Sequence, residues 1–309
     1  MRTNDPIFVA GHRGMVGSAI CRALEREGFT NVITATRKQC DLSRQDEAEA
    51  FFRNQKPKYV FVAAAKVGGI LANDSYPAEF LYDNLMIAAN TIHAAWKEGV
   101  EKLLFLGSTC IYPKHAEQPI REESLLSGPL EPTNQWYAVA KIAGAKLCEA
   151  YQLQYGARFI SCMPTNLYGQ NDNFDLKTSH VLPALIRKFH EAKVAGSPEV
   201  ELWGTGKPLR EFLHCDDLAE ASLFLMRNYE GREVVNVGYG SDVTIEQLAG
   251  IIATAVGYEG GIRYDTSKPD GTPRKLADSS KLRALGWAPR ISLEEGIRAT
   301  YEWYLAHAA

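Results

Sequence analysis

The chain has 309 residues, of which 46% are hydrophobic and 23% are charged, an ordinary globular composition. This length suits two domains, or one domain with a large appendage. The formal net charge of −3 implies no broad basic field, which argues against a nucleic-acid partner.

The cysteines and the N-terminus point to a reducing, cytosolic environment. None of the six cysteines forms a CxxC pair, and their spacing fits neither a zinc site nor a disulfide framework. The first six residues lack the apolar stretch of a signal peptide. No run approaches the roughly 18 apolar residues of a membrane span. We therefore expect a cytoplasmic protein with no bound metal and no membrane partner.

Strands and helices alternate through the first half of the chain. Short apolar runs predict strands at 7–10, 32–35, 59–63, 103–107 and 159–163. Helical periodicity predicts helices at 13–27, 46–54, 78–98 and 137–155. Strands that are apolar throughout indicate a parallel sheet with both faces covered. We predict an α/β fold, a Rossmann-like doubly wound parallel sheet.

The chain changes character after Pro164. Residues 168–179 are polar and loop-like, and glycine and proline recur further on. We expect a smaller C-terminal α/β lobe over the carboxyl ends of the strands, where ligands bind in open α/β sheets. Strands near Phe212 and at 234–237 would return to the first domain. The predicted division is 1–165, rejoined by about 211–238, for the dinucleotide domain, and 166–210 with 239–309 for the substrate-binding lobe.

Three glycines follow the first predicted strand and open the first predicted helix. The segment reads Gly11-His12-Arg13-Gly14-Met15-Val16-Gly17. Glycines allow a tight turn and a close backbone approach, and the helix N-terminus offers free N–H groups to a pyrophosphate. A glycine-rich turn without a ligand is the alternative. The position between a strand and a helix favours dinucleotide binding, and the GxxGxxG spacing resembles that of the extended short-chain reductases.

The end of the second predicted strand indicates which dinucleotide binds. NAD sites usually carry an acid about 20 residues further on, for the ribose 2′-hydroxyl. Here Thr36-Arg37-Lys38 stands in that place. Arg37 and Arg13 can hold a 2′-phosphate bidentately, whereas the alternative is a solvated basic turn. The sequence therefore favours NADP(H).

A serine, a tyrosine and a lysine occupy positions suited to carbonyl reduction. Tyr137 and Lys141 are four apart on a predicted helix and share a face, and Ser108 follows the fourth predicted strand. We expect the Lys141 ammonium to lower the pKa of Tyr137 from ~10 toward that of a working acid. Ser108 would then hydrogen-bond the carbonyl. Such a pair alone is commonly surface decoration, but the glycine turn and the serine, in this order, favour catalysis.

Cys110 and His180 extend this set. If residues 108–110 are extended, the Cys110 thiol lies on the same side as the Ser108 hydroxyl. A thiol with a pKa near ~8.5 and an imidazole with a pKa near ~6.5 both exchange protons around neutrality. The alternatives are a small buried hydrophobe for Cys110 and a helix-start residue for His180.

Five segments together resemble the GDP-L-fucose synthases, which are extended short-chain dehydrogenases/reductases. They are the glycine turn, Ser-Thr-Cys-Ile-Tyr-Pro at 108–113, the Tyr137/Lys141 pair, Asn-Leu-Tyr-Gly at 166–169 and Ser-His-Val-Leu-Pro at 179–183. The resemblance runs from about Ile7 to the C-terminus.

The resemblance implies a reaction in two stages. GDP-4-keto-6-deoxy-D-mannose would be epimerised at C3 and C5 and then reduced at C4 by NADPH to give GDP-L-fucose. In the terms of that family, Cys110 and His180 are the epimerisation base and acid, and Tyr137 is the reduction acid.

The resemblance also implies binding residues and a partner. Lys188, Trp203, Arg210 and Asp270 match positions that bind the GDP part, although singly such residues are more often surface charges or core. The long helices at 78–98 and 137–155 would form a homodimer interface. Implied cofactor contacts are Gly11, His12, Arg13, Gly14, Met15, Val16, Gly17, Arg37, Asp41, Leu42, Ala63, Leu106, Gly107, Ser108, Thr109, Tyr137, Lys141, Pro164, Thr165, Asn166, Leu167 and His180.

Two other functions fit parts of the pattern. Another nucleotide-sugar 4-epimerase or 4,6-dehydratase of the extended short-chain type shares the glycine turn, but dehydratases usually carry Thr-Asp-Glu where this chain has Ser108-Thr109-Cys110. A non-catalytic NADP-sensing Rossmann protein shares the fold, and fold alone does not fix function. Such proteins often lose the Tyr/Lys pair, which this chain keeps.

Overall fold

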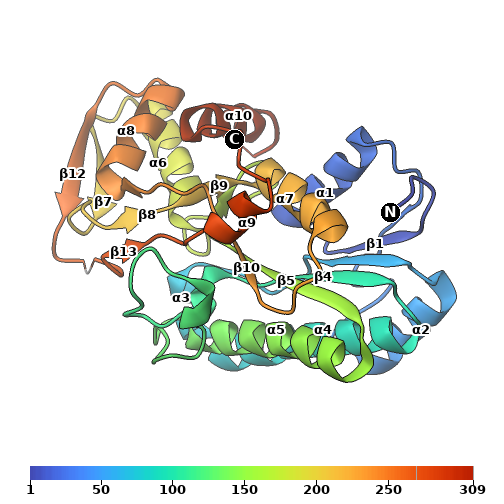
Figure 1. The fold of residues 1–309 in the computed structure, drawn as a ribbon. Coiled ribbons are helices and arrows are strands. Elements are labelled where there is room, and N and C mark those ends of the chain that lie inside the picture. The colour runs from blue at the N-terminus through green and yellow to red at the C-terminus, as the bar shows by residue number, and fades with distance from the viewer. Residues whose placement is uncertain (269, 309) are drawn as a thin grey trace.

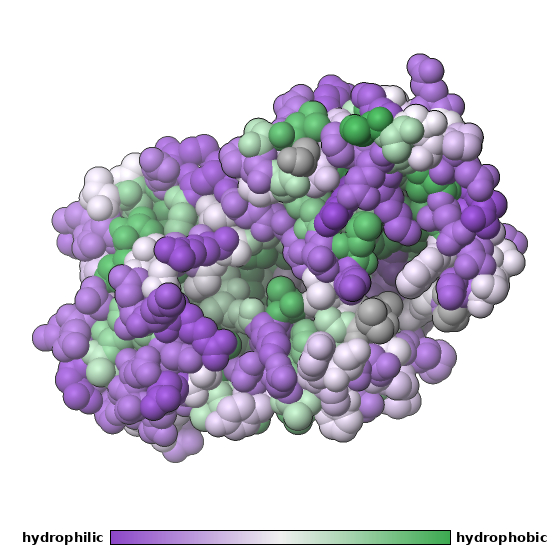
Figure 2. All heavy atoms as spheres, turned by 180° about the vertical axis from the view of Figure 1, so that it is seen from behind, coloured by the Kyte–Doolittle hydropathy of each residue, from purple (hydrophilic) through white to green (hydrophobic). Residues whose placement is uncertain are grey.

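A parallel sheet and a smaller group of helices and strands beside it make up the molecule. The computed structural model describes residues 1–268 and 270–308. Figure 1 shows helices above and below the large sheet, with the second group at one end of it. From behind, the surface is hollowed between these two parts, and hydrophobic residues show in the hollow (Figure 2).

The large sheet has six strands in the order β10-β5-β4-β3-β1-β2, and every pair is parallel. The strands are β1 (Ile7–Ala10), β2 (Val32–Ile33), β3 (Tyr59–Val62), β4 (Lys102–Leu106), β5 (Arg158–Pro164) and β10 (Val235–Val237). β1, β3 and β4 are buried along their whole length, as expected when helices cover both faces. The predicted doubly wound α/β fold is confirmed.

Helices cover the two faces in two groups (Figure 1). α1 (Met15–Arg26) and α7 (Cys215–Asn228) pack on one face, against alternate strand residues that include Ile7 and Phe61. α2 (Gln45–Gln55), α4 (Pro77–Lys97) and α5 (Gln135–Tyr155) pack on the other, against Phe8 and Phe105. Because side chains alternate along a strand, each face supplies its own apolar layer.

The second part has its own core between three helices and short strands. The helices are α6 (Val181–Ala195), α8 (Ile245–Val256) and α10 (Leu293–His307). The strands pair as β7 (Glu199–Trp203) with β12 (Gly261–Asp265), and β8 (Leu209–Arg210) with β11 (Val243–Thr244) and β13 (Arg274–Lys275). α8 and α10 each begin with a capping box, at Thr244 and Ser292. The remaining helices are α3 (Ile70–Ser75) and α9 (Ser280–Ala284).

Two details differ from the sequence prediction. Only the strand at 235–237 joins the large sheet; β9 (Phe212–His214) pairs instead with β6 (Asn166–Tyr168), where no strand was predicted. The predicted strand at 103–107 begins one residue earlier, at the wholly buried Lys102. Pairing between distant segments decides both points, and it leaves little local signal. Within the described residues, no helix combines the length and apolar character needed to cross a bilayer.

Candidate active site

The glycine turn links β1 to α1 in the way the sequence predicts. Gly11 has a φ of +84°, and a Cβ there would lie 2.7 Å from Ala64 N. A Cβ on Gly17 would lie 2.1 Å from Gly11 O. Gly14 precedes α1, and no side chain of the described residues caps the helix. The first N–H groups of α1 therefore stay available to an anion, as a dinucleotide pyrophosphate requires.

Two side chains at the carboxyl edge of the sheet, one in this turn and one after β5, have unused hydrogen-bonding capacity. His12 Nδ1 and Thr165 Oγ1 are buried, and neither has a partner among the described residues. Burial and the neighbouring Arg13 lower the pKa of His12, which favours its neutral ring. Orphaned polar atoms beside a glycine cradle fit a bound nucleotide.

The end of β2 carries an ordered but exposed arginine. Arg37 Nε donates to Asp41 Oδ2 at 3.0 Å, and 73% of the Arg37 side chain is exposed. Asp41 also accepts from Ser43 N–H at 3.0 Å and from Ser43 Oγ at 2.7 Å. Next to this segment lies a hollow of about 410 Å³ lined in part by Gln39 and Glu47. Arg37 is thus presented at the carboxyl end of β2, where the ribose of a dinucleotide lies in this fold.

Ser108 and Cys110 follow β4 at the carboxyl edge of the sheet. Residues Thr109–Ile111 form a 3₁₀ turn, so the predicted extended conformation at 108–110 is wrong. The Cys110 N–H instead donates to Ser108 Oγ at 3.3 Å. Cys110 is buried, which raises the pKa of its thiol, while Lys275, Ser108 and Lys141 act to lower it. The hydroxyl and the thiol are neighbours, but through a turn and not through strand alternation.

Tyr137 and Lys141 lie one turn apart on α5, as predicted. Lys141 Nζ is 5.6 Å from the centre of the Tyr137 ring and donates to Leu106 O at 2.7 Å. Burial lowers the pKa of Lys141 to about 8. The Tyr137 pKa differs from the prediction: burial and then Cys110 raise it. Because desolvation outweighs the ammonium, Tyr137 is held as a neutral phenol that has a proton to give.

His180 belongs to the other part of the molecule. It immediately precedes α6 and does not use its side chain to cap that helix. The residue is exposed to solvent, yet the protein around it lowers the pKa of its imidazole through desolvation. An exposed ring with protein around it is typical of a residue that lines an open cleft.

Other predicted cofactor residues lie along the same edge of the sheet. Gly107 follows β4, Pro164 ends β5, and Thr165 N–H donates to Val237 O at 3.1 Å. The Asn166 side chain donates to Glu211 O at 2.8 Å, which makes it a link to the second part of the molecule. Leu42 is buried, and Ala63 and Leu167 are half-buried.

Trp203 ends β7 in the second part of the molecule. It is 65% exposed, and the amines of Lys188 and Lys268 lie 5.7 Å and 5.6 Å from its ring centre. Asp270 accepts from Thr205 N–H at 2.8 Å and from Thr205 Oγ1 at 2.7 Å, so both of its carboxylate oxygens hold the turn after Trp203. The expected role of Asp270 toward a base competes with this structural role.

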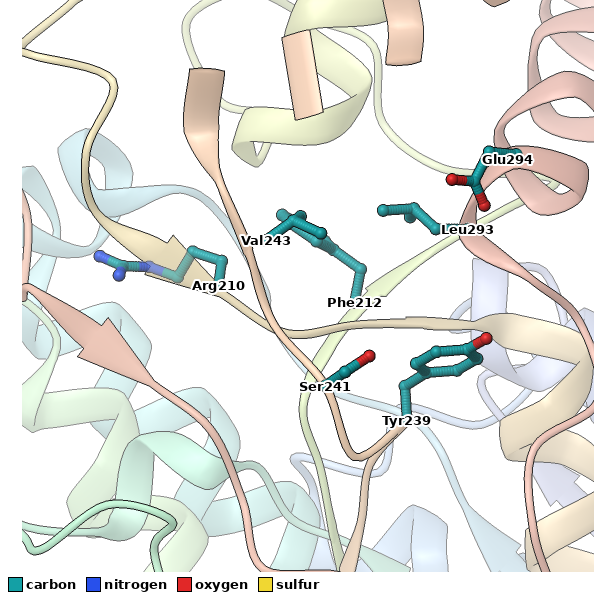
Figure 3. Close-up of a pocket in the computed structure, with 7 residues that line it drawn as sticks. All are labelled: Arg210, Phe212, Tyr239, Ser241, Val243, Leu293 and Glu294. Atoms are coloured by element: carbon teal, nitrogen blue, oxygen red, sulfur yellow. The ribbon is translucent and has the colours of Figure 1, made fainter. Parts of the chain in front are cut away.

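Arg210 lies in β8, between β11 and β13. It donates to Leu209 O at 2.7 Å and to Thr272 O at 2.6 Å, and burial lowers its pKa. Arg210 also borders a cavity of about 130 Å³, but its guanidinium points away from the other lining side chains, which include Tyr239 and Glu294 (Figure 3). That cavity is too small for a nucleotide sugar.

Lys275 is a residue that the sequence analysis missed. It lies in β13, which pairs with β8, so that Lys275 is opposite Arg210. Burial lowers its pKa, and its charge acts on Cys110 and Arg210. No described side chain forms an ion pair or hydrogen bond with its amine. Two neighbouring cations without a shared counter-ion suit an anionic ligand, but a lone lysine in a loop-rich stretch gives no local signal.

Comparisons with known proteins place the chain in a family. The profile described as "NAD dependent epimerase/dehydratase family" matches residues 7–238. GDP-L-fucose synthase 1 of Arabidopsis thaliana is 61% identical over 299 residues, which are 97% of this chain and 93% of that relative.

Two solved structures have the same fold over nearly the whole chain. One is a GDP-L-fucose synthetase from Naegleria fowleri bound to NADP, with a TM-score of 0.92 and 31% identity, covering 99% of this chain and 95% of that one. The other is MlghC, a GDP-mannoheptose C4 reductase from Campylobacter jejuni with NADP bound, with a TM-score of 0.93 and 40% identity, covering 99% of both chains. The chain therefore belongs to the NAD dependent epimerase/dehydratase family and, within it, to the GDP-L-fucose synthases.

Proposed function

We propose that the protein converts GDP-4-keto-6-deoxy-D-mannose to GDP-L-fucose, by epimerisation at C3 and C5 followed by reduction of the C4 ketone with NADPH. The observation that carries this proposal is the grouping of Ser108, Cys110, Tyr137 and Lys141 at the edge of the sheet that also carries the glycine turn. Membership of the GDP-L-fucose synthases supports the choice of substrate.

Epimerisation requires a base and an acid at the same sugar. The C4 ketone acidifies the hydrogens on C3 and C5, so a base can remove each as a proton while an acid returns one on the opposite face. Cys110 is the proposed base and His180 the proposed acid. A lowered pKa makes the protonated form of His180 a stronger acid, which suits this role.

Reduction uses the phenol that burial keeps protonated. NADPH, when bound, supplies the hydride to C4. Tyr137 donates its proton to the developing alkoxide, and Ser108 orients the same oxygen by a hydrogen bond. Lys141 is close enough to stabilise the phenolate that remains. The enolate of the first stage carries its charge on the same oxygen, so one set of donors serves both stages.

The preference for NADP(H) over NAD(H) and the contacts with the substrate are part of the same proposal. Arg37 at the end of β2, with Arg13, would hold the 2′-phosphate of NADP(H), and two relatives solved with NADP bound support that cofactor. Arg210 and Lys275 would bind the diphosphate of the substrate. Lys188 and Trp203 would contact the nucleoside, with Asp270 keeping the turn after Trp203 in place.

The domain division and the dimer are also proposed. Residues 1–165 with about 211–238 would form the dinucleotide domain, and 166–210 with 239–309 the substrate-binding lobe. A homodimer through α4 and α5 is supported by large hydrophobic side chains exposed on these helices. They are Tyr82, Leu85, Trp136, Val139, Leu153 and Tyr155.

One incubation tests the reaction directly. Purified protein is mixed with GDP-4-keto-6-deoxy-D-mannose and NADPH in deuterated water, nicotinamide absorbance is followed, and the sugar is identified. We expect NADPH consumption and GDP-L-fucose labelled at C3 and C5. A product reduced at C4 with no label would mean a reductase without epimerase activity, and no NADPH consumption would contradict the proposal.

A further inference from the structure

The segment between β3 and α4 lies between two residues that the proposed reaction uses as acids. It includes Gly68, Gly69 and α3, none of which was singled out by the sequence. On one side it packs against the residues that lead into His180. On the other it reaches an aromatic side chain that contacts Tyr137.

Gly69 packs directly against the chain just before His180. Its N–H donates to Thr178 O at 2.8 Å. A Cβ on Gly69 would lie 2.6 Å from Ser179 O and 3.4 Å from Thr178 O, and real Cβ atoms essentially never approach another atom as closely as 2.6 Å. The φ of −65° and ψ of 179° at Gly69 are open to any residue. The close approach to Ser179 is therefore what requires glycine here.

Side-chain amides hold this segment in place. Asn73 is buried, and its Nδ2 donates to Gly68 O at 2.8 Å and to Gly69 O at 3.1 Å. Asn84 in α4 is also buried; its Oδ1 accepts from Lys66 N–H at 2.9 Å and its Nδ2 donates to Lys66 O at 3.0 Å. Because backbone groups on both sides of the turn are bound, Gly69 cannot retreat easily from Ser179.

The same segment reaches Tyr137 through Phe80. A Cβ on Gly68 would lie 3.2 Å from Phe80 Cζ. The Phe80 ring meets the Tyr137 ring edge-on, with 6.5 Å between the centres and an interplanar angle of 75°. A continuous set of contacts thus joins the residues before His180, which belongs to the second part of the molecule, to Tyr137 on the large sheet.

From these contacts we infer that Gly69 is a positioning residue: the Gly68–Gly69 segment sets where His180 stands relative to Tyr137. The inference rests on the proposed function, in which both residues act on one sugar. Proton transfer needs heavy atoms within about 2.6–3.2 Å, and a misplacement of about 1 Å can cost about 10²-fold in rate. A methyl group at Gly69 would push residues 178–180 outward while leaving Ser108, Cys110 and Tyr137 in place.

The test compares Gly69→Ala with Gly250→Ala. The control adds the same methyl group in α8, where nothing lies within 4 Å of the new Cβ. Two rates are measured: deuterium incorporation at C3 and C5 of GDP-4-keto-6-deoxy-D-mannose, and NADPH oxidation with the already epimerised ketone. In Gly69→Ala we expect the first rate to fall by about tenfold or more and the second to stay within about twofold of wild type. Gly250→Ala should change neither.

Asn73→Ala provides a second variant that adds no bulk. It frees Gly68 O and leaves Gly69 O with only the backbone N–H of residue 73, and we expect a smaller loss of the same selective kind. The inference is overturned if Gly69→Ala exchanges deuterium at the wild-type rate, or if both rates fall by the same factor. Should Gly69→Ala not fold, an equal change of both rates in Asn73→Ala would overturn it. A wild-type protein that incorporates no deuterium would overturn the proposed function instead, and the inference with it.

Discussion

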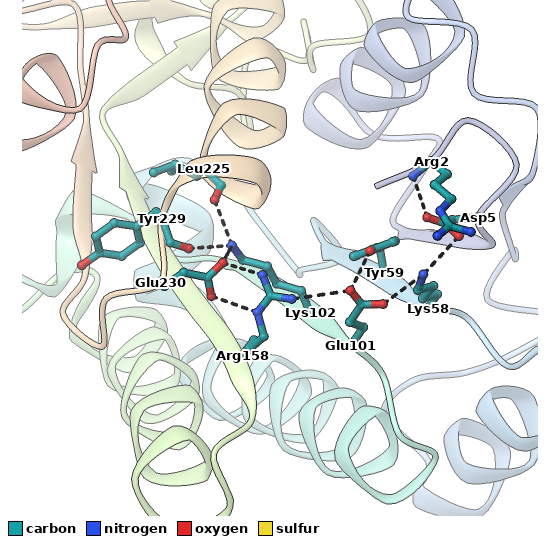
Figure 4. Close-up of polar contacts among 10 residues, drawn as sticks. All are labelled: Arg2, Asp5, Lys58, Tyr59, Glu101, Lys102, Arg158, Leu225, Tyr229 and Glu230. Carbon is teal, nitrogen blue, oxygen red and sulfur yellow. Dashed lines mark hydrogen bonds and ion pairs between the residues drawn. The ribbon is translucent and has the colours of Figure 1, made fainter.

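The two ends of the six-stranded sheet hold buried charges in opposite ways. At the amino end, Lys102 is wholly buried, and its Nζ is 2.6 Å from Tyr229 O, 3.3 Å from Leu225 O and 2.9 Å from Glu230 Oε1 (Figure 4). At the carboxyl end, Lys141 is 4% exposed, and Leu106 O is the one hydrogen-bond partner of its amine among the described residues.

The amino end is a closed network of charges. Glu230 also accepts from Arg158 Nε at 3.0 Å, and Arg158 and Lys102 together lower the pKa of Glu230 to about 2. Arg158 continues the network to Glu101 at 3.5 Å, which in turn pairs with Lys58 at 3.1 Å (Figure 4). Each charge has a partner, so this end serves the structure.

The buried ionisable groups at the carboxyl end keep unused hydrogen-bonding capacity. Lys141, Cys110 and Lys275 have pKa values shifted mainly by burial, and charged partners do not compensate for it. Burying a charge without a charged partner costs stability. Perturbed groups gathered in a cleft are typical of catalytic sites. In this sheet, buried charges with charged partners are structural residues, whereas buried charges without such partners are functional ones. Burial alone does not distinguish the two kinds.

The largest effect should come from Tyr137→Phe. Removing the phenolic proton should lower the rate of ketone reduction by about 10²–10⁴-fold, because the Ser108 hydroxyl that orients the same oxygen is a far weaker acid than a phenol. Stability to urea should stay close to that of wild type. Tyr155→Phe, which removes an exposed hydroxyl from the same helix, is the matched control. Both are assayed by NADPH oxidation, and near-normal turnover of Tyr137→Phe would remove this residue from the mechanism.

Cys110→Ser should affect the two stages unequally. A serine hydroxyl ionises far less readily than a thiol, so little of the basic form is present; deuterium exchange at C3 and C5 should fall by about 10²-fold, and reduction of the already epimerised ketone much less. Because burial raises the pKa of the thiol, the wild-type exchange rate should climb as pH rises toward that pKa and more thiolate forms. Cys21→Ser, at a cysteine outside the site, is the control. Equal loss of both stages would argue against separate roles.

A matched pair of variants, Lys102→Met and Lys141→Met, contrasts the two ends directly. Lys102→Met leaves Tyr229 O without its partner, whereas Leu225 O keeps the Tyr229 N–H, and the loss should cost about 1–3 kcal/mol of unfolding free energy. It should leave turnover within about twofold of wild type. Lys141→Met should abolish most reduction and yet stabilise the protein at pH 7, since it removes a buried cation.

The stability difference between wild type and Lys141→Met should depend on pH, and the direction of that dependence can be predicted. The folded pKa of Lys141 is about 8 and its ordinary value is 10.5, so burying the cation costs most below pH 8, by up to about 3 kcal/mol. Between pH 8 and 10.5 the folded protein has lost the proton and the unfolded chain has not, so wild-type stability recovers relative to the variant. Urea unfolding at pH 7 and pH 10 measures this; equal destabilisation by both substitutions would contradict the comparison.

The carboxyl end was more predictable from sequence than the amino end. Gly11, Gly14 and Gly17 stand at a fixed spacing after an apolar run, and Tyr137 and Lys141 are one helical turn apart, so local patterns were enough to find them. In the sequence, Lys102 looks like an ordinary charged residue before a strand. Only its contacts with the end of α7 and with Glu230 explain its burial.

Several site features depend on segments far apart in the chain. The turn at Cys110, the pairing of β13 with β8 that puts Lys275 opposite Arg210, and the approach of Gly69 to Ser179 have no local pattern. In each case tertiary packing decides the geometry. Burial, which reverses the expected direction for the pKa of Tyr137, is likewise a property of the folded chain.

The smallest expected effect concerns a charge at the carboxyl end that already has a partner. Arg37 pairs with Asp41 and is exposed, so Arg37→Asp should change stability by no more than about 1 kcal/mol. If Arg37 also holds the 2′-phosphate, kcat/KM for NADPH relative to NADH should fall by about tenfold or more, because a carboxylate would repel that phosphate. Arg44→Asp makes the same change of charge at an exposed residue that pairs with Glu47, and it should leave the ratio unchanged. A ratio equally unaffected by both substitutions would place the phosphate contact elsewhere, and Arg37 would then resemble the amino-end charges, whose pairing serves only the structure.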